Sequence, residues 1–196
     1  RYNIKRNEIL DKLVEIVASD ISSLTNPLKI YKTFLSEGIK DLSQNTIFDY
    51  LLYLEDAFLI SKAQRYDVKG RKYISTPYKY YFADIGLRNA KLNFRQNEET
   101  HIMDNMIYNE LLVRGYNVDV AVVEILNKDK EKNKYTRENV EIDFVCNKAA
   151  ERYYIQSALS LDTREKTIQE TRSLLAVKEG FKKIVIVKED IKPWIT

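Results

Sequence analysis

The sequence is poor in the residue types on which many sites and frameworks depend. A single cysteine, Cys146, excludes an internal disulfide framework and is typical of proteins from a reducing cytoplasm. A single histidine, His101, argues against a histidine-based zinc site and against a Ser-His-acid triad within one chain. No run approaches the roughly 20 apolar residues of a membrane span, and no signal-peptide pattern opens the chain. We therefore expect a cytoplasmic protein without a membrane partner.

Charge is abundant but nearly balanced. The 32 basic and 29 acidic residues leave a net charge of +3, which does not by itself argue for binding to nucleic acid. A hydrophobic content of 44% is ordinary for a globular chain, and 196 residues suffice for one large domain or two small ones. Because the chain starts at Arg1 and stops at Thr196 without an obvious signal, we expect a fragment of something longer.

The first half of the sequence predicts helices and then a β-ribbon. Apolar residues at helical spacing predict helices over 7–21, 27–38 and from Ser43 to about residue 58. The period then becomes that of strands, at 59–66 and 79–83. Three helices followed by a ribbon is the element order of a winged helix-turn-helix domain.

The predicted ribbon is basic, which favours contact with DNA phosphates. Its candidate nucleic-acid-binding residues are Lys62, Arg65, Lys69, Arg71 and Lys72. The alternative is an interaction scaffold whose lysines only protect a solvated strand edge. The preceding helix favours this alternative, because it carries acids and no lysine or arginine, which is poor for a recognition helix.

The second half of the sequence predicts an order of αβββαβ. The expected elements are a helix from Asn97 to Gly115, strands at 117–125, 140–146 and 153–158, a helix from Asp162 to about Lys178, and a strand at 184–187. The last strand and its preceding helix imply a parallel, right-handed crossover, and hence a mixed sheet.

Three details of this half are specific enough to test. Asp162 and Glu165 have capping-box spacing, so Asp162 is the expected start of its helix. The polar run 127–138 is expected to form a solvated hairpin tip. The continuous apolar run 184–187 predicts a strand buried on both faces of the sheet.

Three polar residues stand where apolar ones are expected. Glu110 lies on or beside the apolar stripe of its helix, and Asp143 and Gln156 interrupt two strands. Side chains brought together from neighbouring strands form many hydrolytic sites, but an ordinary sheet edge has the same pattern. For Glu110, the ordinary interpretation is an ion pair with Arg114 at i+4.

This order of elements resembles the PD-(D/E)XK, or restriction-endonuclease-like, core. Three segments extend the resemblance: Y-Y-F-A-D-I-G-L-R-N at 80–89, I-Y-N-E-L-L-V-R-G-Y-N-V at 107–118 and V-E-I-D-F-V at 140–145. They are similar to the C-terminal half of a family of P-loop, AAA-type ATPases of unclear role. In that family an ATPase module precedes a winged helix and a nuclease-like domain. The resemblance covers nearly the whole chain.

The resemblance implies a two-domain protein of the α+β or α/β class. The expected domains are a winged helix-turn-helix at 1–95 and a degenerate nuclease-like core at 96–196. No G-x-x-x-x-G-K-[ST] occurs in the sequence, so ATP is expected only in a module outside this chain. The implied partners are that module, DNA through the ribbon, and another protein or a second copy of the chain.

The resemblance also indicates which residues a nuclease would use. Active cores carry a helix Glu, a strand Asp and a Glu-x-Lys, where this chain has Glu110, Asp143 and Gln156-Ser157-Ala158. The carboxylates hold Mg²⁺ and the lysine helps activate a water molecule. Gln156 lacks the charge and Ala158 lacks the ammonium group, so we expect a degenerate site. No neighbouring residue obviously replaces that lysine; a migrated Lys166 is the alternative.

Three hypotheses of function follow. The first is a non-catalytic regulatory, nucleic-acid-binding or assembly region of an AAA-type ATPase. The second is a Mg²⁺-dependent nuclease that uses Glu110, Asp143 and either Glu141 or Gln156. The third is a winged-helix DNA-binding regulator that acts through the basic ribbon.

Overall fold

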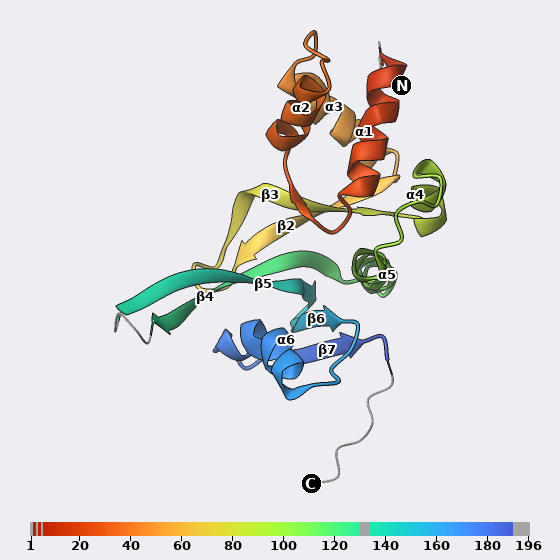
Figure 1. Cartoon of the computed structure of the whole chain (residues 1–196). Coiled ribbons are helices and arrows are strands. Elements are labelled where there is room, and N and C mark those ends of the chain that lie inside the picture. Colours follow the sequence, from red (N-terminus) through yellow and green to blue (C-terminus); the bar gives the residue numbers. More distant parts are fainter. Residues whose placement is uncertain (1, 3, 5, 130–133, 190–196) are drawn as a thin grey trace. The chain divides into compact units, whose positions relative to one another are not determined.

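The computed structural model describes residues 2, 4, 6–129 and 134–189. The fold is mixed α/β, with six helices and seven strands in the described residues, paired in the order β1-β3-β2-β4-β5-β6-β7 (Figure 1). Contacts divide the chain into two compact units. Unit 1 comprises Arg1–Ala63 and Ser75–Asn109, and unit 2 comprises Gln64–Ile74 and Glu110–Thr196. The units therefore interleave along the chain, whereas the sequence suggested consecutive domains.

The three predicted helices of unit 1 are confirmed. They are α1 (Asn7–Ser19), α2 (Pro27–Ser36) and α3 (Gln44–Asp56). The Asn26 side chain caps α2 by accepting a hydrogen bond from the Lys29 N–H at 2.8 Å, with proline at the first helical position. Their apolar faces form one core with the strands; its fully buried members include Leu13, Phe34 and Ile47.

Unit 1 is completed by short strands and two further helices. The elements are β1 (Leu24–Thr25), part of β2 (Ile60–Asp67), part of β3 (Lys72–Phe82), α4 (Ile85–Lys91) and most of α5 (Glu99–Val113). β3 is longer than the strand predicted at 79–83. The residues before Pro77 are mostly polar and do not show the apolar alternation from which a strand is predicted. The seven-residue α4 is too short for a periodic signal, although Asp84 caps it through the Leu87 N–H.

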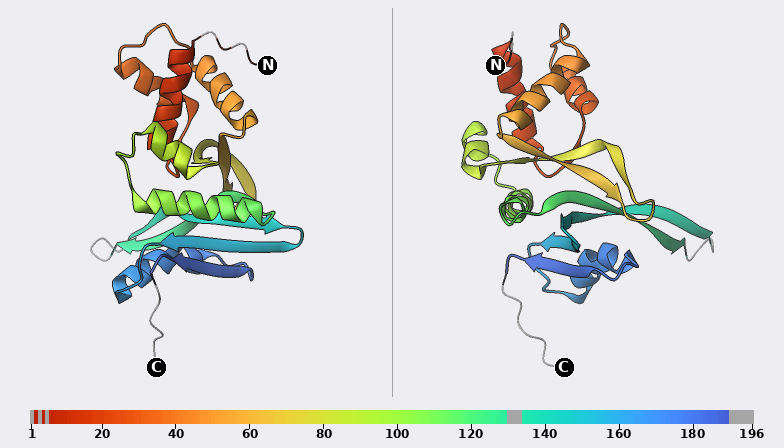
Figure 2. Two further views of the ribbon diagram at one scale, coloured as in Figure 1. Left: turned by 90° about the vertical axis from the view of Figure 1, so that its right-hand side faces the viewer. Right: turned by 180° about the vertical axis from the view of Figure 1, so that it is seen from behind.

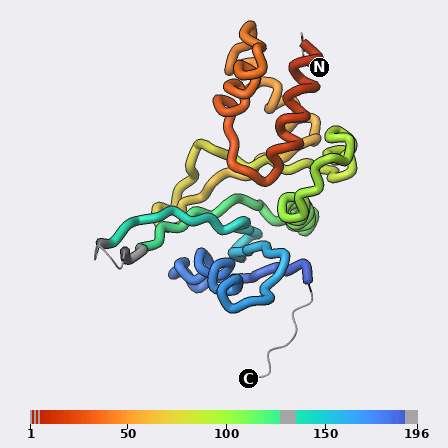
Figure 3. Tube along the Cα trace, in the orientation of Figure 1, coloured from red at the N-terminus to blue at the C-terminus, as the bar shows by residue number. Residues whose placement is uncertain are grey.

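Unit 2 contains a meander and a crossover. The meander consists of β4 (Asn117–Asp129), β5 (Lys134–Lys148) and β6 (Glu151–Ala158) (Figure 2). β4 pairs antiparallel with β5, and β5 pairs antiparallel with β6. A tight turn joins β5 to β6, and Ala149 within it has a φ of 53°. Figure 3 shows the path of the chain as a tube. α6 (Arg164–Ala176) then leads to β7 (Lys182–Val187), which pairs parallel with β6. The predicted parallel crossover is confirmed.

Two local predictions for unit 2 are wrong, and a third is refined. The cap of α6 is Thr163, whose hydroxyl accepts from the Lys166 N–H at 3.1 Å, and not Asp162. The polar run 127–138, expected as a hairpin tip, lies at the end of the β4–β5 hairpin; pairing extends to Asp129 opposite Lys134, and residues 130–133 lie outside the described residues. β7 is exposed or half-buried, because it ends the strand order and has a neighbour on one side only.

No helix within the described residues is long and apolar enough to cross a membrane.

Candidate functional site

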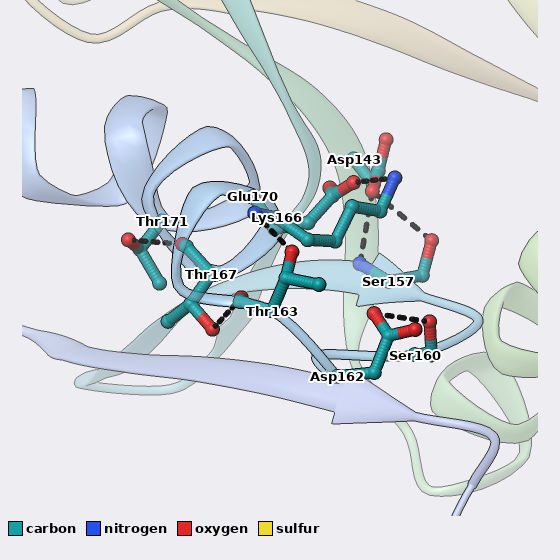
Figure 4. A network of polar contacts seen from close by, with 9 residues as sticks. All are labelled: Asp143, Ser157, Ser160, Asp162, Thr163, Lys166, Thr167, Glu170 and Thr171. Atoms are coloured by element: carbon teal, nitrogen blue, oxygen red, sulfur yellow. Dashed lines mark hydrogen bonds and ion pairs between the residues drawn. The ribbon is translucent and has the colours of Figure 1, made fainter.

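Asp143 lies at the end of the β5–β6 pairing. The last paired residues are Phe144 and Ile155, and the next position of β5 is Asp143. Its carboxylate accepts hydrogen bonds from the Ser157 backbone N–H at 2.9 Å and the Ser157 hydroxyl at 3.0 Å (Figure 4). The side chain therefore takes the place of a backbone acceptor where the ladder stops. This is a structural use for the carboxylate that the sequence placed at a nuclease site.

Gln156 faces α6. Its side-chain oxygen lies 3.5 Å from the Ser173 hydroxyl, the outer limit of a hydrogen bond. Ala158, two residues on, is buried. Neither position supplies the charge that a Glu-x-Lys pair would bring to a metal or a water molecule.

Glu110 forms the i,i+4 ion pair with Arg114 that is the ordinary interpretation of its position. Its carboxylate pairs with Arg114 one helical turn later at 2.7 Å, and 58% of the Glu110 side chain is exposed. In the described residues, no group of three or more histidine, cysteine, aspartate or glutamate side chains could hold a metal ion. Glu110 and Asp143, the predicted metal ligands, are thus not part of such a group.

A second acid and a lysine lie on α6. Lys166 and Glu170 form an i,i+4 ion pair at 2.8 Å, with 39% and 15% of their side chains exposed. Figure 4 draws the Lys166 side chain extending from α6 toward Asp143. Lys166 was predicted from the sequence as an alternative and Glu170 was not, although the i,i+4 spacing of the pair was an available signal.

The predicted nucleic-acid-binding residues differ in how far their charge is neutralised. Three are in ion pairs with acids of their own unit: Lys62 with Glu55 at 3.1 Å, Arg65 with Glu141 at 3.6 Å, and Lys69 with Glu124 at 2.7 Å. Arg71 and Lys72 are exposed at the β2–β3 turn. An acid at ion-pair distance competes with a phosphate, so the basic ribbon offers less charge than its sequence suggests.

Unit 1 contains a Ser-His-acid arrangement that the sequence did not indicate. The Ser22 hydroxyl lies 2.5 Å from His101 Nδ1, and His101 Nε2 lies 3.4 Å from the Glu98 carboxylate. Ser22 also has a φ of 55°, a strained geometry for serine. No pattern in the sequence predicts this contact, since 79 positions separate Ser22 from His101.

This arrangement lacks what a hydrolase needs. Only 3% of Ser22 is exposed, so a substrate cannot reach its hydroxyl. Its backbone N–H donates to the Tyr80 carbonyl at 3.0 Å and is not available to an oxyanion. We therefore interpret the three residues as a structural network that runs from buried Ser22 to the exposed Glu98.

The segment 80–89, which carried part of the resemblance, also has a structural use. The Arg88 guanidinium is fully buried and donates to the carbonyls of Ala18 at 2.9 Å and Gln96 at 2.5 Å. Asn105, buried on α5, bonds both the N–H and the carbonyl of Phe82 at 2.7 Å. Asn105 thus satisfies backbone groups at the end of β3, and Arg88 satisfies carbonyls at the end of α1 and after α4.

Two further titratable groups of unit 2 have shifted pKa values. Burial raises the pKa of the Cys146 thiol to about 12, so it is not a nucleophile near neutral pH. Burial also raises the pKa of Asp119, although hydrogen bonds from the Gln64 N–H and the Tyr73 hydroxyl, both at 3.0 Å, oppose the shift. Asp119 lies at a register shift between β4 and β5.

The chain is similar to proteins without a described function. Residues 2–98 match a domain of unknown function, DUF8612. An uncharacterised protein of Haemophilus influenzae is 35% identical over 186 residues, which is 95% of this chain and 42% of that protein. An uncharacterised protein of Methanocaldococcus jannaschii is 29% identical over 144 residues, covering 73% of this chain and 28% of that protein. The chain thus spans less than half of either relative. No solved structure matches it significantly.

Proposed function

We propose that the chain is a non-catalytic regulatory or assembly region of a longer AAA-type ATPase. It combines a winged helix-turn-helix with a nuclease-like domain that has lost its hydrolytic site. The observation that carries this proposal is the Asp143 carboxylate, which bonds Ser157 twice and has Gln156 and Ala158 where a Glu-x-Lys would stand. A site with this composition lacks the charge to bind Mg²⁺ and to activate water.

The order of elements supports the nuclease-like assignment. Unit 2 has an antiparallel β4-β5-β6 meander, a crossover through α6, and β7 parallel to β6. With α5 before them, these elements follow the αβββαβ order of the nuclease core. The winged-helix assignment rests on α1 to α3 followed by the β2–β3 ribbon. The ATPase assignment rests on the sequence resemblance, and the greater length of both relatives leaves room for such a module.

Contact with protein is favoured over contact with DNA. Ion pairs neutralise three of the five predicted phosphate-binding residues, as described above. The outer face of α6 also exposes two apolar side chains one heptad apart, Ile168 at 58% and Leu175 at 75%. Buried Leu174 and Ser173 mark its inner face. An exposed apolar stripe on a helix suits packing against another protein surface.

Two experiments test this proposal. The first incubates the purified chain and its Asp143→Ala variant with plasmid DNA and Mg²⁺ or Mn²⁺. We expect no cleavage that depends on Asp143, and such cleavage would contradict the non-catalytic assignment. The second adds the chain in trans to the ATPase module of its full-length protein. We expect a change in ATPase rate or oligomeric state that Leu175→Asp abolishes, and no change in either quantity argues against an assembly role.

The position of Lys166 and Glu170 favours one second candidate, a Mg²⁺-dependent nuclease with a shifted site. Two carboxylates and a lysine, from Asp143, Glu170 and Lys166, would then replace the usual set. They do not fit a metal site as they stand, because Glu170 is paired with Lys166 and Asp143 with Ser157. In the plasmid assay, cleavage lost in both Lys166→Ala and Glu170→Gln but kept in Glu110→Gln would establish this candidate over the first.

A further inference from the structure

Unit 2 contains a cavity of about 530 Å³ that the proposed function does not use. Its walls come from three segments: the β2–β3 turn, the middle of β4, and the end of α6 with the residues that follow it. Small-molecule sites in proteins are commonly concave, have volumes of roughly 300–1,000 Å³ and combine apolar walls with a few polar groups. The size of this cavity therefore suits a small organic ligand.

The floor of the cavity is apolar. Val68, Val123 and Val177 line it, and all three are buried members of the unit 2 core. Their side chains are anchored by that core, so the floor does not depend on a mobile segment. A ring or a short hydrocarbon chain placed here would be removed from water, and burial of its apolar surface favours binding.

The rim carries both acids and cations, but the acids are already engaged. Glu124 pairs with Lys69 at 2.7 Å and Arg137 at 3.8 Å, which lowers the pKa of its carboxyl group. Glu179 accepts a hydrogen bond from the Tyr154 hydroxyl at 2.6 Å and lies 3.5 Å from Arg152. Neither carboxylate needs a ligand to balance its charge.

Two rim cations remain. Arg71 from the turn and Lys178 from the segment after α6 are exposed, and neither side chain has an ion pair or hydrogen bond within the described part of the chain. The turn that places Arg71 is held by the Asp67 carboxylate, which accepts from the Gly70 N–H at 2.9 Å. A Cβ at Gly70 would come within 2.3 Å of that carboxylate, so the turn depends on glycine.

We propose that this cavity binds a small organic anion that joins an apolar ring or chain to one phosphate or carboxylate group. The apolar body lies against Val68, Val123 and Val177, and the acidic group lies between Arg71 and Lys178. Both parts are needed, because the floor offers no donor to a bare anion and the cations offer nothing to a neutral hydrocarbon. This separates the cavity from a surface that binds nucleic-acid phosphates.

The test measures binding to the whole chain by isothermal titration calorimetry at fixed salt, with phenyl phosphate, benzoate, inorganic phosphate and phenol as probes. We expect phenyl phosphate or benzoate to bind, the better one showing which acidic group is preferred, and phosphate and phenol to bind at least tenfold more weakly. Arg71→Ala and Lys178→Ala should each weaken binding about tenfold, since each removes a hydrogen bond to a charged group.

Two controls distinguish the cavity from its surroundings. Lys72→Ala removes the adjacent exposed cation, which does not line the cavity, and should leave binding unchanged. Ala176→Phe fills the cavity from its rim and should abolish binding while the thermal unfolding midpoint stays close to that of the parent chain. Equal losses in Lys72→Ala and Arg71→Ala, undiminished binding in a folded Ala176→Phe, or no binding of either organic anion would each overturn the proposal. Displacement of the bound anion by duplex DNA in a Lys72-dependent manner would overturn it in favour of a nucleic-acid surface.

Discussion

The two units use their polar side chains differently. In unit 1, Arg88 and Asn105 are fully buried and form hydrogen bonds with main-chain groups, so their role is to stabilise the fold. In unit 2, Asp143, Lys166 and Glu170 lie where a ladder ends and on a half-exposed helix face. Buried polar groups that bond the backbone stabilise the fold, whereas polar groups with partial exposure and side-chain partners can be exchanged for a ligand. In these examples the polar groups of unit 1 stabilise the fold, and those of unit 2 remain open to a change of partner.

The largest expected effect breaks the buried network of unit 1. Arg88→Met should lower the free energy of unfolding by about 3–4 kcal/mol, because it leaves the Ala18 and Gln96 carbonyls without a donor in the interior. Denaturation followed by circular dichroism measures the loss. The exposed Arg95→Met is the control and should stay within about 0.5 kcal/mol of the parent. Equal effects in the two variants would contradict the structural role of Arg88.

A second variant tests how α5 holds the end of β3. Asn105→Ala should cost about 2–3 kcal/mol, since it removes both hydrogen bonds to Phe82 in a fully buried position. Asn109→Ala, which removes bonds to the Phe82 and Ala83 carbonyls at a less buried position, should cost about 1 kcal/mol. Hydrogen exchange of β3 read by mass spectrometry should rise more in the first variant. The reverse order would show that burial does not decide the cost.

The corresponding change in unit 2 should be smaller. Asp143→Ala removes two hydrogen bonds to Ser157 from a partly buried place, at a cost of about 1–2 kcal/mol. Hydrogen exchange should increase in β5 and β6 and leave α1 to α3 unchanged. Asp162→Ala, in an exposed acid that does not cap α6, serves as the control. A loss as large as that of Arg88→Met would remove the contrast between the units.

The smallest expected effect is a dependence of the free energy of unfolding on pH. Because burial raises the pKa of Asp119, the folded state binds a proton more tightly than the unfolded state does. The free energy of unfolding should therefore fall as pH rises from the ordinary aspartate range through the raised pKa. Asp119→Asn should remove this component of the slope in a series of denaturation curves. An unchanged slope would show that Asp119 titrates alike in both states.

The local elements of the fold were largely predictable. Asn26-Pro27 and Ser43 mark helix starts by chemistry that acts within four residues, and both predictions are confirmed. The crossover from β6 to β7 also followed from the lengths of the segments. The wrong prediction for β7 concerns its neighbouring strands. β7 is apolar in sequence yet lies at the end of the strand order, and a pattern of residues does not show how many strands will flank it.

The candidate site was predictable only in its composition. The neutral Gln156 and the small Ala158 are visible in the sequence, and they suffice to predict a site without the usual charges. The partners of Asp143, of Glu170 and of the basic ribbon were not predictable, because each depends on which segments pack together. The Ser22–His101 contact and the cavity rim of Arg71 and Lys178 are of the same kind.

The sequence by itself determined most of the helices and strands, the parallel crossover and the neutral residues at positions 156 and 158. These follow from period, capping and residue type, which are properties of short segments. Only the tertiary structure decided that Asp143 bonds Ser157 and that three ribbon cations are in ion pairs. It also decided that unit 2 has a cavity with two cations that have no ion pair among the described residues. The physical reason is that ion pairs and cavities join residues far apart in the chain, whose distances are fixed only once the core has packed.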